Sequence, residues 1–150
     1  MTKVLSRLLI ITMLVAGILV VGGCASVEPA YQKVDNIPDN VGLVYIYRPN
    51  SDTGGDISYD IKVGDTTITT LYAGGYYPYF CRPAKVEFWA KTESKSAVTL
   101  DIKAGQTYYI KGAVGIGSFA GQPYLAVVAP ELAEKEIVEC KLIRGKKERE

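Results

Sequence analysis

The residue of this chain best placed for covalent chemistry is Cys24, which follows a short apolar segment near the N-terminus. Two positive residues, Lys3 and Arg7, precede an uncharged apolar run over residues 8–21, and Gly22–Gly23 then leads into the cysteine. A positive start, an apolar middle and small residues before the cut form the layout of a secretory signal peptide. A thiol at this position can accept a diacylglyceryl group as a thioether, and cleavage before it leaves a lipidated N-terminus. The sequence therefore predicts that residues 1–23 are a lipoprotein signal peptide.

A transmembrane helix and an ordinary secreted protein are the two alternatives to a lipid anchor. A membrane-spanning helix needs about 20 apolar residues, and the run over residues 8–21 is shorter. In a secreted protein Cys24 would be incidental. With lipidation, two or three acyl chains would hold the chain to a bilayer, since one chain alone binds only marginally. Ala25 is not the aspartate that usually retains a lipoprotein in an inner membrane, which favours the outer membrane, with the domain facing the periplasm.

Removal of the signal peptide would leave 127 of the 150 residues, which is enough for one domain. Lys3 and Arg7 would be removed with it, so 15 basic side chains would remain with 16 acidic ones. A nearly neutral chain argues against nucleic acid as a partner, because nucleic-acid binding requires a clustered basic surface. We expect residues 24–41 to form a lipidated tether, residues 42–143 the domain, and residues 144–150 a solvated charged tail.

Two cysteines, Cys81 and Cys140, remain once Cys24 is assigned to the lipid. Exported proteins form disulfides, and an even number of cysteines favours a bond between the two. The alternative is two buried thiols, each packing as a small hydrophobic side chain. A disulfide needs Cα atoms roughly 4.4–6.8 Å apart, a condition that only the fold decides.

The chain contains no histidine, the commonest general base near neutral pH and a common metal ligand. A serine or cysteine nucleophile activated by histidine is therefore excluded. Three carboxylates, Asp52, Asp56 and Asp60, surround the Gly54–Gly55 pair, where they could serve a carboxylate mechanism or bind calcium. Their spacing does not match an EF-hand loop, and aspartates are common at turns, so a solvated loop is the favoured interpretation. We predict no catalytic residue, no cofactor and no metal site.

Two segments are candidates for contact with a partner. The glycine-rich segment Gly115–Gly121 leads into a proline and a strand rather than a helix, so it matches a phosphate-binding loop poorly. We expect a flexible connection with Ile116 and Phe119 near its tip, where exposed apolar side chains often mark interfaces. Tyr76 and Tyr77 follow a glycine turn, and we expect them to be exposed as well.

Other aromatic and charged residues of the predicted strands have a structural explanation. Most of the 11 tyrosines, including Tyr45, Tyr59 and Tyr108, occupy regular strand positions, where packing within the sheet is favoured over stacking against a glycan. Trp89 falls on the polar side of its strand, so it either covers the sheet face or contacts a partner. Arg48 ends an apolar strand, and pairing with a nearby carboxylate is favoured over an interaction with a partner.

The elements that must position these residues are about eight short strands joined by turns. Residues 43–48 form a continuous β-branched and aromatic run, typical of a central strand buried on both faces. The other expected strands, which alternate or lie between glycine and proline turns, cover residues 57–63, 66–72, 76–81, 85–91, 98–102, 106–114 and 124–128. Pro130 suits the first turn of a helix that we expect to extend to about Cys140, although residues 138–142 also alternate like a strand. The pattern is typical of an all-β sandwich or barrel. We expect a sandwich with one short C-terminal helix, preceded by an N-terminal signal helix.

Several segments of the chain occur in the order typical of one protein family. They are Tyr45–Pro49, Gly74–Tyr76, Ala90–Glu93, Ala104–Lys111 and Glu139–Leu142. Together with Cys24 and the residues before it, they resemble the bacterial lipoprotein family catalogued as the domain of unknown function DUF2846. The middle of the chain is also similar in layout to PEGA-type surface domains, which implies a small immunoglobulin- or transthyretin-like sandwich. The resemblance implies a lipoprotein and no particular activity.

We therefore expect a membrane-anchored lipoprotein of the bacterial cell envelope that acts as a non-catalytic binding or accessory module. Besides the membrane, the expected partner is an envelope protein or a glycan. The alternative is a structural subunit of an envelope or secretion assembly. Enzymatic activity is the least favoured function, because no set of residues in the sequence supports a catalytic mechanism.

Overall fold

The computed structural model describes residues 30–115 and 121–144. The predicted signal peptide, Cys24, the loop residues Ile116 and Phe119, and residues 145–150 lie outside the described residues. The described chain is mostly β-structure in two sheets with one short helix, which confirms the predicted class. None of the helical structure in the described ranges has the length and hydropathy of a membrane span.

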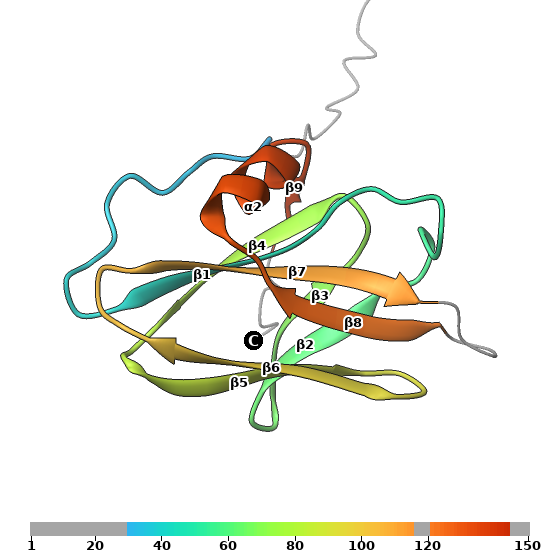
Figure 1. Ribbon diagram of the computed structural model, residues 1–150, viewed down its shortest axis with the longest axis horizontal. Coiled ribbons are helices and arrows are strands. Elements are labelled where there is room, and N and C mark those ends of the chain that lie inside the picture. The colour runs from blue at the N-terminus through green and yellow to red at the C-terminus, as the bar shows by residue number, and fades with distance from the viewer. Residues whose placement is uncertain (1–29, 116–120, 145–150) are drawn as a thin grey trace, which may run out of the picture.

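The two sheets lie as layers, with helix α2 (Pro130–Ile137) on the far side of the larger sheet (Figure 1). The larger sheet has the strand order β8-β7-β1-β4-β9 and the smaller one has the order β3-β2-β5-β6. The five strands of the larger sheet are β1 (Gly42–Arg48), β4 (Gly75–Cys81), β7 (Thr107–Gly115), β8 (Gln122–Val127) and β9 (Lys141–Leu142). The four-stranded sheet contains β2 (Tyr59–Val63), β3 (Thr66–Leu71), β5 (Ala84–Lys91) and β6 (Lys95–Ile102).

Strand β1 lies at the centre of the five-stranded sheet, as its continuous apolar sequence predicts. It pairs with β4 in antiparallel and with β7 in parallel orientation, and all of its residues are buried. Val44 and Ile46 belong to the core between the sheets, whereas Tyr45 and Tyr47 belong to a second core on the opposite face. Because both faces are covered, this strand carries apolar side chains at consecutive positions.

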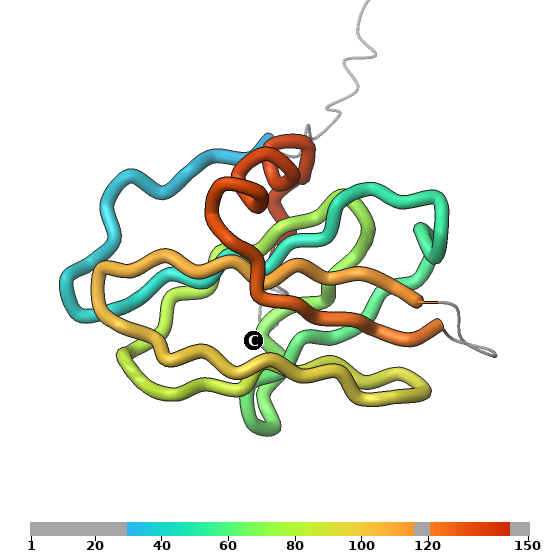
Figure 2. Tube along the Cα trace, in the orientation of Figure 1, coloured from blue at the N-terminus to red at the C-terminus, as the bar shows by residue number. Residues whose placement is uncertain are grey.

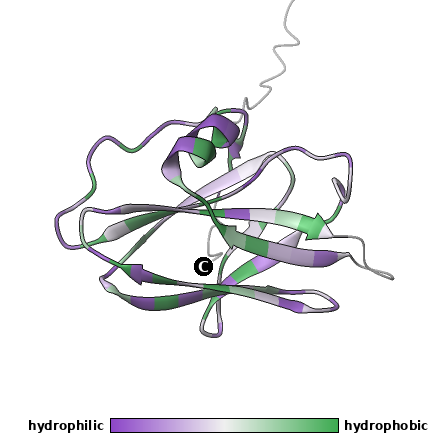
Figure 3. Cartoon of the chain, in the orientation of Figure 1, coloured by the Kyte–Doolittle hydropathy of each residue, from purple (hydrophilic) through white to green (hydrophobic). Residues whose placement is uncertain are grey.

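The core between the two sheets is built from alternate residues of the four-stranded sheet. Strand β5 contributes Phe88 and Ala90, and β6 contributes Leu100 and Ile102, while the residues between them lie on the outer face. Bands of hydrophobic and hydrophilic residues therefore alternate along these strands (Figure 3). The outer face of this sheet has no layer of described structure above it (Figure 1).

The second core covers the outer face of the five-stranded sheet. Its sheet side is made of tyrosines, among them Tyr45 and Tyr109, whose rings stack with centroids 5.5 Å apart. Helix α2 contributes Ala133 and Ile137 from its buried side. The amphipathic helix thus closes a face that would otherwise expose a large aromatic surface.

Residues 30–41 pack on the same core and are not a free tether, which corrects the predicted start of the domain. Tyr31, Val34 and Ile37 contact the second core, and Ala30 forms an isolated bridge to β9. In Figure 2 this blue segment and the red helix lie on the same side of the five-stranded sheet. Three apolar residues at every third position among polar ones are too sparse a pattern to predict packing from sequence.

The helix is shorter than the sequence pattern predicts. It ends at Ile137, and the chain then turns into β9, which pairs in parallel with β4. The backbone N–H groups of Lys141 and Ile143 donate to the carbonyls of Gly74 and Tyr76. Hydrogen bonds to the edge of β4 replace those of a continued helix, so the strand-like alternation of this segment is the correct interpretation.

Candidate functional site

A notch opens in the four-stranded sheet at the point where β2 and β5 separate. The two strands form only two ladder pairs, of which Lys62–Trp89 is the pair nearer the notch. Beyond it, the first residues of β2 pair only with β3, and the last residues of β5 pair only with β6. A continued ladder would place Asp60 opposite Lys91, and the notch occupies the space between those two strand segments.

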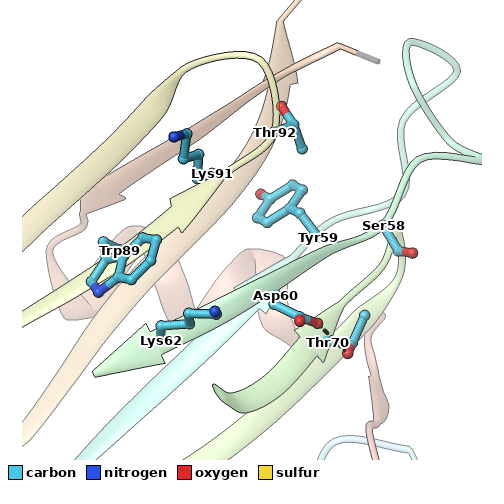
Figure 4. Close-up of a pocket in the computed structure, with 8 residues that line it drawn as sticks. All are labelled: Ser58, Tyr59, Asp60, Lys62, Thr70, Trp89, Lys91 and Thr92. Carbon is cyan, nitrogen blue, oxygen red and sulfur yellow. Dashed lines mark hydrogen bonds between the residues drawn. The ribbon is translucent and has the colours of Figure 1, made fainter. Parts of the chain in front are cut away.

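The notch has a volume of about 540 Å³ and a mixed polar and aromatic lining (Figure 4). Its lining residues are Ser58, Tyr59, Asp60 and Lys62 on one side, Trp89, Lys91 and Thr92 on the other, and Thr70 from β3. Tyr59 is buried at the base, where its hydroxyl donates to the carbonyl of Ala113 at 3.0 Å. Burial raises the pKa of Tyr59 to about 12, so this phenol is neutral at physiological pH.

Side-chain hydrogen bonds hold the two walls of the notch apart. The hydroxyl of Thr92 donates to the backbone carbonyl of Gly121 at 2.6 Å, which ties the end of β5 to the chain entering β8. On the other wall, the hydroxyl of Thr70 donates to Asp60 Oδ1 at 2.7 Å and holds β2 against β3. Each wall is therefore bonded to a different neighbour, and the ladder between β2 and β5 does not continue.

Trp89, the only tryptophan of the chain, lies on the outer face of β5 beside the notch, which confirms its predicted placement on the polar side. Its indole Nε1 donates to the carbonyl of Gly64 at 2.9 Å, so the ring is fixed against the β2–β3 turn. The Nζ atoms of Lys62 and Lys95 lie 5.3 Å and 5.2 Å from the ring centroid. Such cation–π contacts place positive charge next to a half-buried aromatic surface.

The charge of the notch is positive in balance. Lys95 lies 2.8 Å from Glu87 and is neutralised outside the notch. Within the described residues, Lys62 and Lys91 have no carboxylate at ion-pair distance. Among the lining residues that the structure describes, Asp60 is the one acidic side chain, so two ammonium groups accompany a single carboxylate there.

The structure separates the three aspartates that the sequence places in one loop. Asp60 lines the notch, whereas Asp52 and Asp56 are exposed residues of the segment between β1 and β2. Among residues 30–115 and 121–144, no group of three or more potential metal ligands comes together.

Arg48 pairs with no carboxylate of the described chain, which corrects the expectation for this residue. Its side chain is 1% exposed, and its guanidinium donates to the backbone carbonyls of Ile57 and Gly54. The guanidinium carbon lies 5.8 Å from the ring centroid of Tyr59. Burial lowers the pKa of Arg48. By holding residues 49–58 in a loop, Arg48 orders the entry to β2, which therefore starts later than predicted.

Tyr76 and Tyr77 are not exposed, so this part of the predicted contact surface is wrong. Tyr76 is 3% exposed within the second core, and Tyr77 is half-buried against the core between the sheets. Phe80 is the aromatic residue of β4 that is exposed, to 43%. The unforeseen packing of residues 30–41 and β9 around β4 is the physical reason.

Cys81 and Cys140 are both free thiols, so the predicted disulfide is wrong. Lys141, next to Cys140, pairs with Gly75 at the start of β4, whereas Cys81 is the last residue of that seven-residue strand. Such a strand spans roughly 20 Å at about 3.3 Å per residue, far beyond the reach of a disulfide. Cys140 is buried, and burial raises its pKa to about 11, whereas Cys81 is only half-buried.

Two carboxylates of α2 have structural partners in the second core. The hydroxyl of Tyr47 donates to Glu136 at 2.7 Å, and that of Tyr109 donates to Glu134 at 3.0 Å. Lys111 Nζ also lies 2.5 Å from Glu136. Burial alone would raise the pKa of Glu136, but the hydrogen bonds from Lys111 and Tyr47 outweigh it and hold the pKa below the usual range. These groups fasten the helix to the sheet.

A second cavity, of about 600 Å³, lies on the other side of the Asp60–Thr70 pair. Tyr72, Tyr77 and Ile143 contribute its apolar lining, and several threonines of β3 complete it. Because Asp60 and Thr70 line both cavities, this hydrogen-bonded pair forms the partition between them.

The sequence reasoning did not single out Lys62, Lys91 or Thr70. The alternation that buries Phe88 places Trp89 and Lys91 on one exposed face, so an aromatic and basic surface could have been inferred. The notch itself has no signal of this kind, because it depends on bonds between distant segments.

Comparison with known proteins gives no match: no protein-family model, no curated protein and no solved structure is similar to the chain. The resemblance to the DUF2846 family therefore stays a prediction. The same is true of Ile116 and Phe119 as partner contacts, since both lie outside the described residues.

Proposed function

We propose that this chain is a membrane-anchored lipoprotein of the bacterial cell envelope, and that its β-sandwich is a non-catalytic binding module whose ligand occupies the notch. The observation that carries this proposal is the placement of the notch relative to the start of the domain. Ala30 pairs with Lys141 of β9, on the side of the molecule that α2 covers. Trp89 and Lys91 belong to the four-stranded sheet, which forms the opposite side (Figure 1).

This placement gives a lipid on Cys24 a defined effect on orientation. Only five residues lie between Cys24 and Ala30, so the two Cα atoms are at most about 22 Å apart at 3.3–3.6 Å per residue. The bilayer would therefore lie near the side covered by α2, and the notch would face the aqueous compartment. Since residues 30–41 are packed onto the domain, they transmit this orientation in a way that a free tether would not.

The chemistry of the notch supports binding rather than catalysis. The described lining of the notch holds one acidic side chain, Asp60, whereas a glycosidase mechanism uses two carboxylates. The chain also has no histidine to act as a general base near neutral pH. An aromatic surface, several hydroxyls and a few charged groups around a concave site are typical of ligand binding.

The finer architecture and location belong to the same proposal. The sandwich is immunoglobulin- or transthyretin-like, which is supported by two packed sheets with mostly antiparallel pairing. Ala25 supports retention at the outer membrane, with the domain in the periplasm. The fold class itself implies no activity.

Metabolic labelling tests the lipid anchor. Cells that express the full chain with Cys24→Ser are grown with labelled palmitate and fractionated, with Cys81→Ser as the matched control. We expect the Cys24 variant to lose both the label and its membrane association, and the control to keep both. Label retained by the Cys24 variant contradicts the anchor.

A structural subunit of an envelope assembly is the second candidate, favoured by exposed apolar side chains on β8 and α2. Tyr124, Val127 and Leu132 are 61%, 51% and 52% exposed. Photo-reactive residues at Lys91 and, separately, at Val127 of the full chain distinguish the two functions in native envelopes. Crosslinks from Lys91 support the binding module, whereas one dominant protein partner at Val127 and none at Lys91 favours the assembly subunit.

A further inference from the structure

We infer that the ligand of the notch is a carboxylated saccharide, recognised by an indole, a carboxylate and two ammonium groups. This inference rests on the proposed binding function and deepens it by naming the ligand class. The indole contacts the sugar ring, the carboxylate binds the sugar hydroxyls, and the two ammonium groups bind the acid group of the ligand.

The ring of a saccharide needs a rigid apolar surface. Trp89 provides one, because the hydrogen bond from its Nε1 to the Gly64 carbonyl holds the indole in place. The ammonium groups of Lys62 and Lys95 lie over the ring, so a bound saccharide would displace at least one of these flexible side chains. An aromatic side chain held in advance offers a large contact area at little cost in conformational entropy. A pyranose ring carries C–H groups on its faces and suits an indole surface of this kind.

The hydroxyls of a saccharide need acceptors and donors at its rim. Asp60 accepts one hydrogen bond from Thr70 at Oδ1, while an ionised carboxylate offers about four acceptor positions. Most of its capacity therefore remains for neighbouring hydroxyls of a ligand. Ser58 adds a hydroxyl on the same wall, which can donate or accept.

The excess of positive charge in the notch indicates that the ligand carries an acid group. Lys62 and Lys91 flank the notch, and Lys91 has no ion-pair partner within the described part of the chain. A single carboxylate placed between them would gain charge-assisted hydrogen bonds. A phosphate carries more negative charge and would lie close to Asp60, so like-charge repulsion favours the singly charged carboxylate.

Fluorescence of the only tryptophan gives a direct binding assay. The mature lipidated protein in detergent micelles is titrated with tetragalacturonate, and with maltotetraose as a neutral probe of equal length. We expect a saturable change in Trp89 emission with tetragalacturonate, and an affinity at least about tenfold lower for the neutral probe, since charge-assisted bonds are lost.

Two variants of β5 locate the effect. Lys91→Ala removes an ammonium group of the notch, and Lys85→Ala removes one from the same outer face of the strand but outside the notch. Both lysines are exposed, so neither change threatens the fold. We expect Lys91→Ala to weaken tetragalacturonate binding about tenfold or more, and Lys85→Ala to leave it unchanged.

Three results would overturn the inference: no saturable binding of tetragalacturonate, equal binding of the neutral probe, or equal loss in the two lysine variants. Tighter binding of inositol hexakisphosphate that Lys91→Ala abolishes would move the ligand to the phosphorylated class and overturn it too. These failures are distinct from failure of the proposed function. If the probe does not bind while Lys91 crosslinks in native envelopes, only the ligand class is wrong.

Discussion

Asp60 and Lys91 occupy facing positions on β2 and β5, beyond the last ladder pair of Lys62 with Trp89, and no ladder joins them. The two side chains therefore line opposite walls of the notch instead of pairing across a continuous sheet. The gap exists because each strand is bonded to another neighbour.

Thr92→Val removes the hydroxyl that binds the end of β5 to Gly121 while keeping the shape of the side chain. We expect the free energy of unfolding to fall by about 1 kcal/mol, the typical net value of one hydrogen bond. Tetragalacturonate binding should weaken as well, because the wall of the notch formed by β5 loses its hydrogen bond to Gly121. Urea unfolding and Trp89 titration measure the two effects. Thr92→Ser keeps the hydroxyl and should preserve both; unchanged binding in the valine variant would show that this bond does not shape the notch.

Arg48→Met removes the guanidinium that donates to the carbonyls of Ile57 and Gly54, and only the Gly54 carbonyl keeps another donor, the N–H of Ile57. We expect a loss of about 2–4 kcal/mol in the free energy of unfolding, since hydrogen bonds from a charged donor contribute about 1.5–3 kcal/mol each. The exposed Arg82→Met is the control and should change stability by less than about 0.5 kcal/mol. Urea denaturation checks both. Equal stability of the two variants contradicts the role assigned to Arg48.

Gly112→Ala places a methyl group where the two sheets approach most tightly around β7. A Cβ atom there would lie 2.4 Å from Leu71 Cδ2 and 2.6 Å from the hydroxyl of Tyr59. We expect destabilisation of about 1–3 kcal/mol from overpacking. Gly115→Ala, in the same strand, meets no atom of the described residues closer than 3.8 Å and should be nearly neutral. Thermal unfolding of the two variants decides; a neutral Gly112→Ala would refute the close approach.

Acid should weaken the attachment of α2 through Glu136. Its pKa is lowered in the folded protein because the hydrogen bonds from Lys111 and Tyr47 outweigh the opposing effect of burial. The stabilisation is therefore present above the ordinary pKa of 4.5 and is lost as pH falls through the lower folded-state value. The melting temperature should drop between about pH 5 and about pH 3.

Glu136→Gln isolates this contribution, because the amide cannot titrate. The variant should be less stable than the parent near neutral pH, and the difference should shrink in acid as the parent loses its charge. Melting temperatures over the same pH range test this. A constant difference at every pH would mean that the ionised carboxylate adds nothing.

The sequence pattern was sufficient to predict burial where the alternation of apolar and polar residues within a single strand determines which side chains face the core. The run from Leu43 to Tyr47 predicts a strand buried on both faces, and the structure confirms it. Trp89 lies on the outer face because Phe88 and Ala90 are buried. Periodicity alone carries this information.

The remaining features depend on contacts between distant segments. Arg48 binds two backbone carbonyls, which no side-chain pattern records. Tyr31 packs on a core to which α2, about a hundred residues later in the sequence, contributes Ala133 and Ile137. The notch arises because Thr92 bonds to Gly121 rather than because of any local sequence in β5. Hydrogen bonds between distant segments thus determine the shape of the candidate site, and the periodicity of the sequence does not predict such bonds.

The central claim is that a lipid-anchored domain presents the notch away from the membrane, and quenching of Trp89 tests it most directly. The mature lipidated protein is reconstituted into liposomes, and its single tryptophan is exposed in turn to iodide in the water and to brominated lipid tails. The account predicts quenching by iodide, reduced when tetragalacturonate is bound, and no quenching by the brominated lipids. Quenching by the lipids with protection from iodide would place the notch against the bilayer and contradict the account.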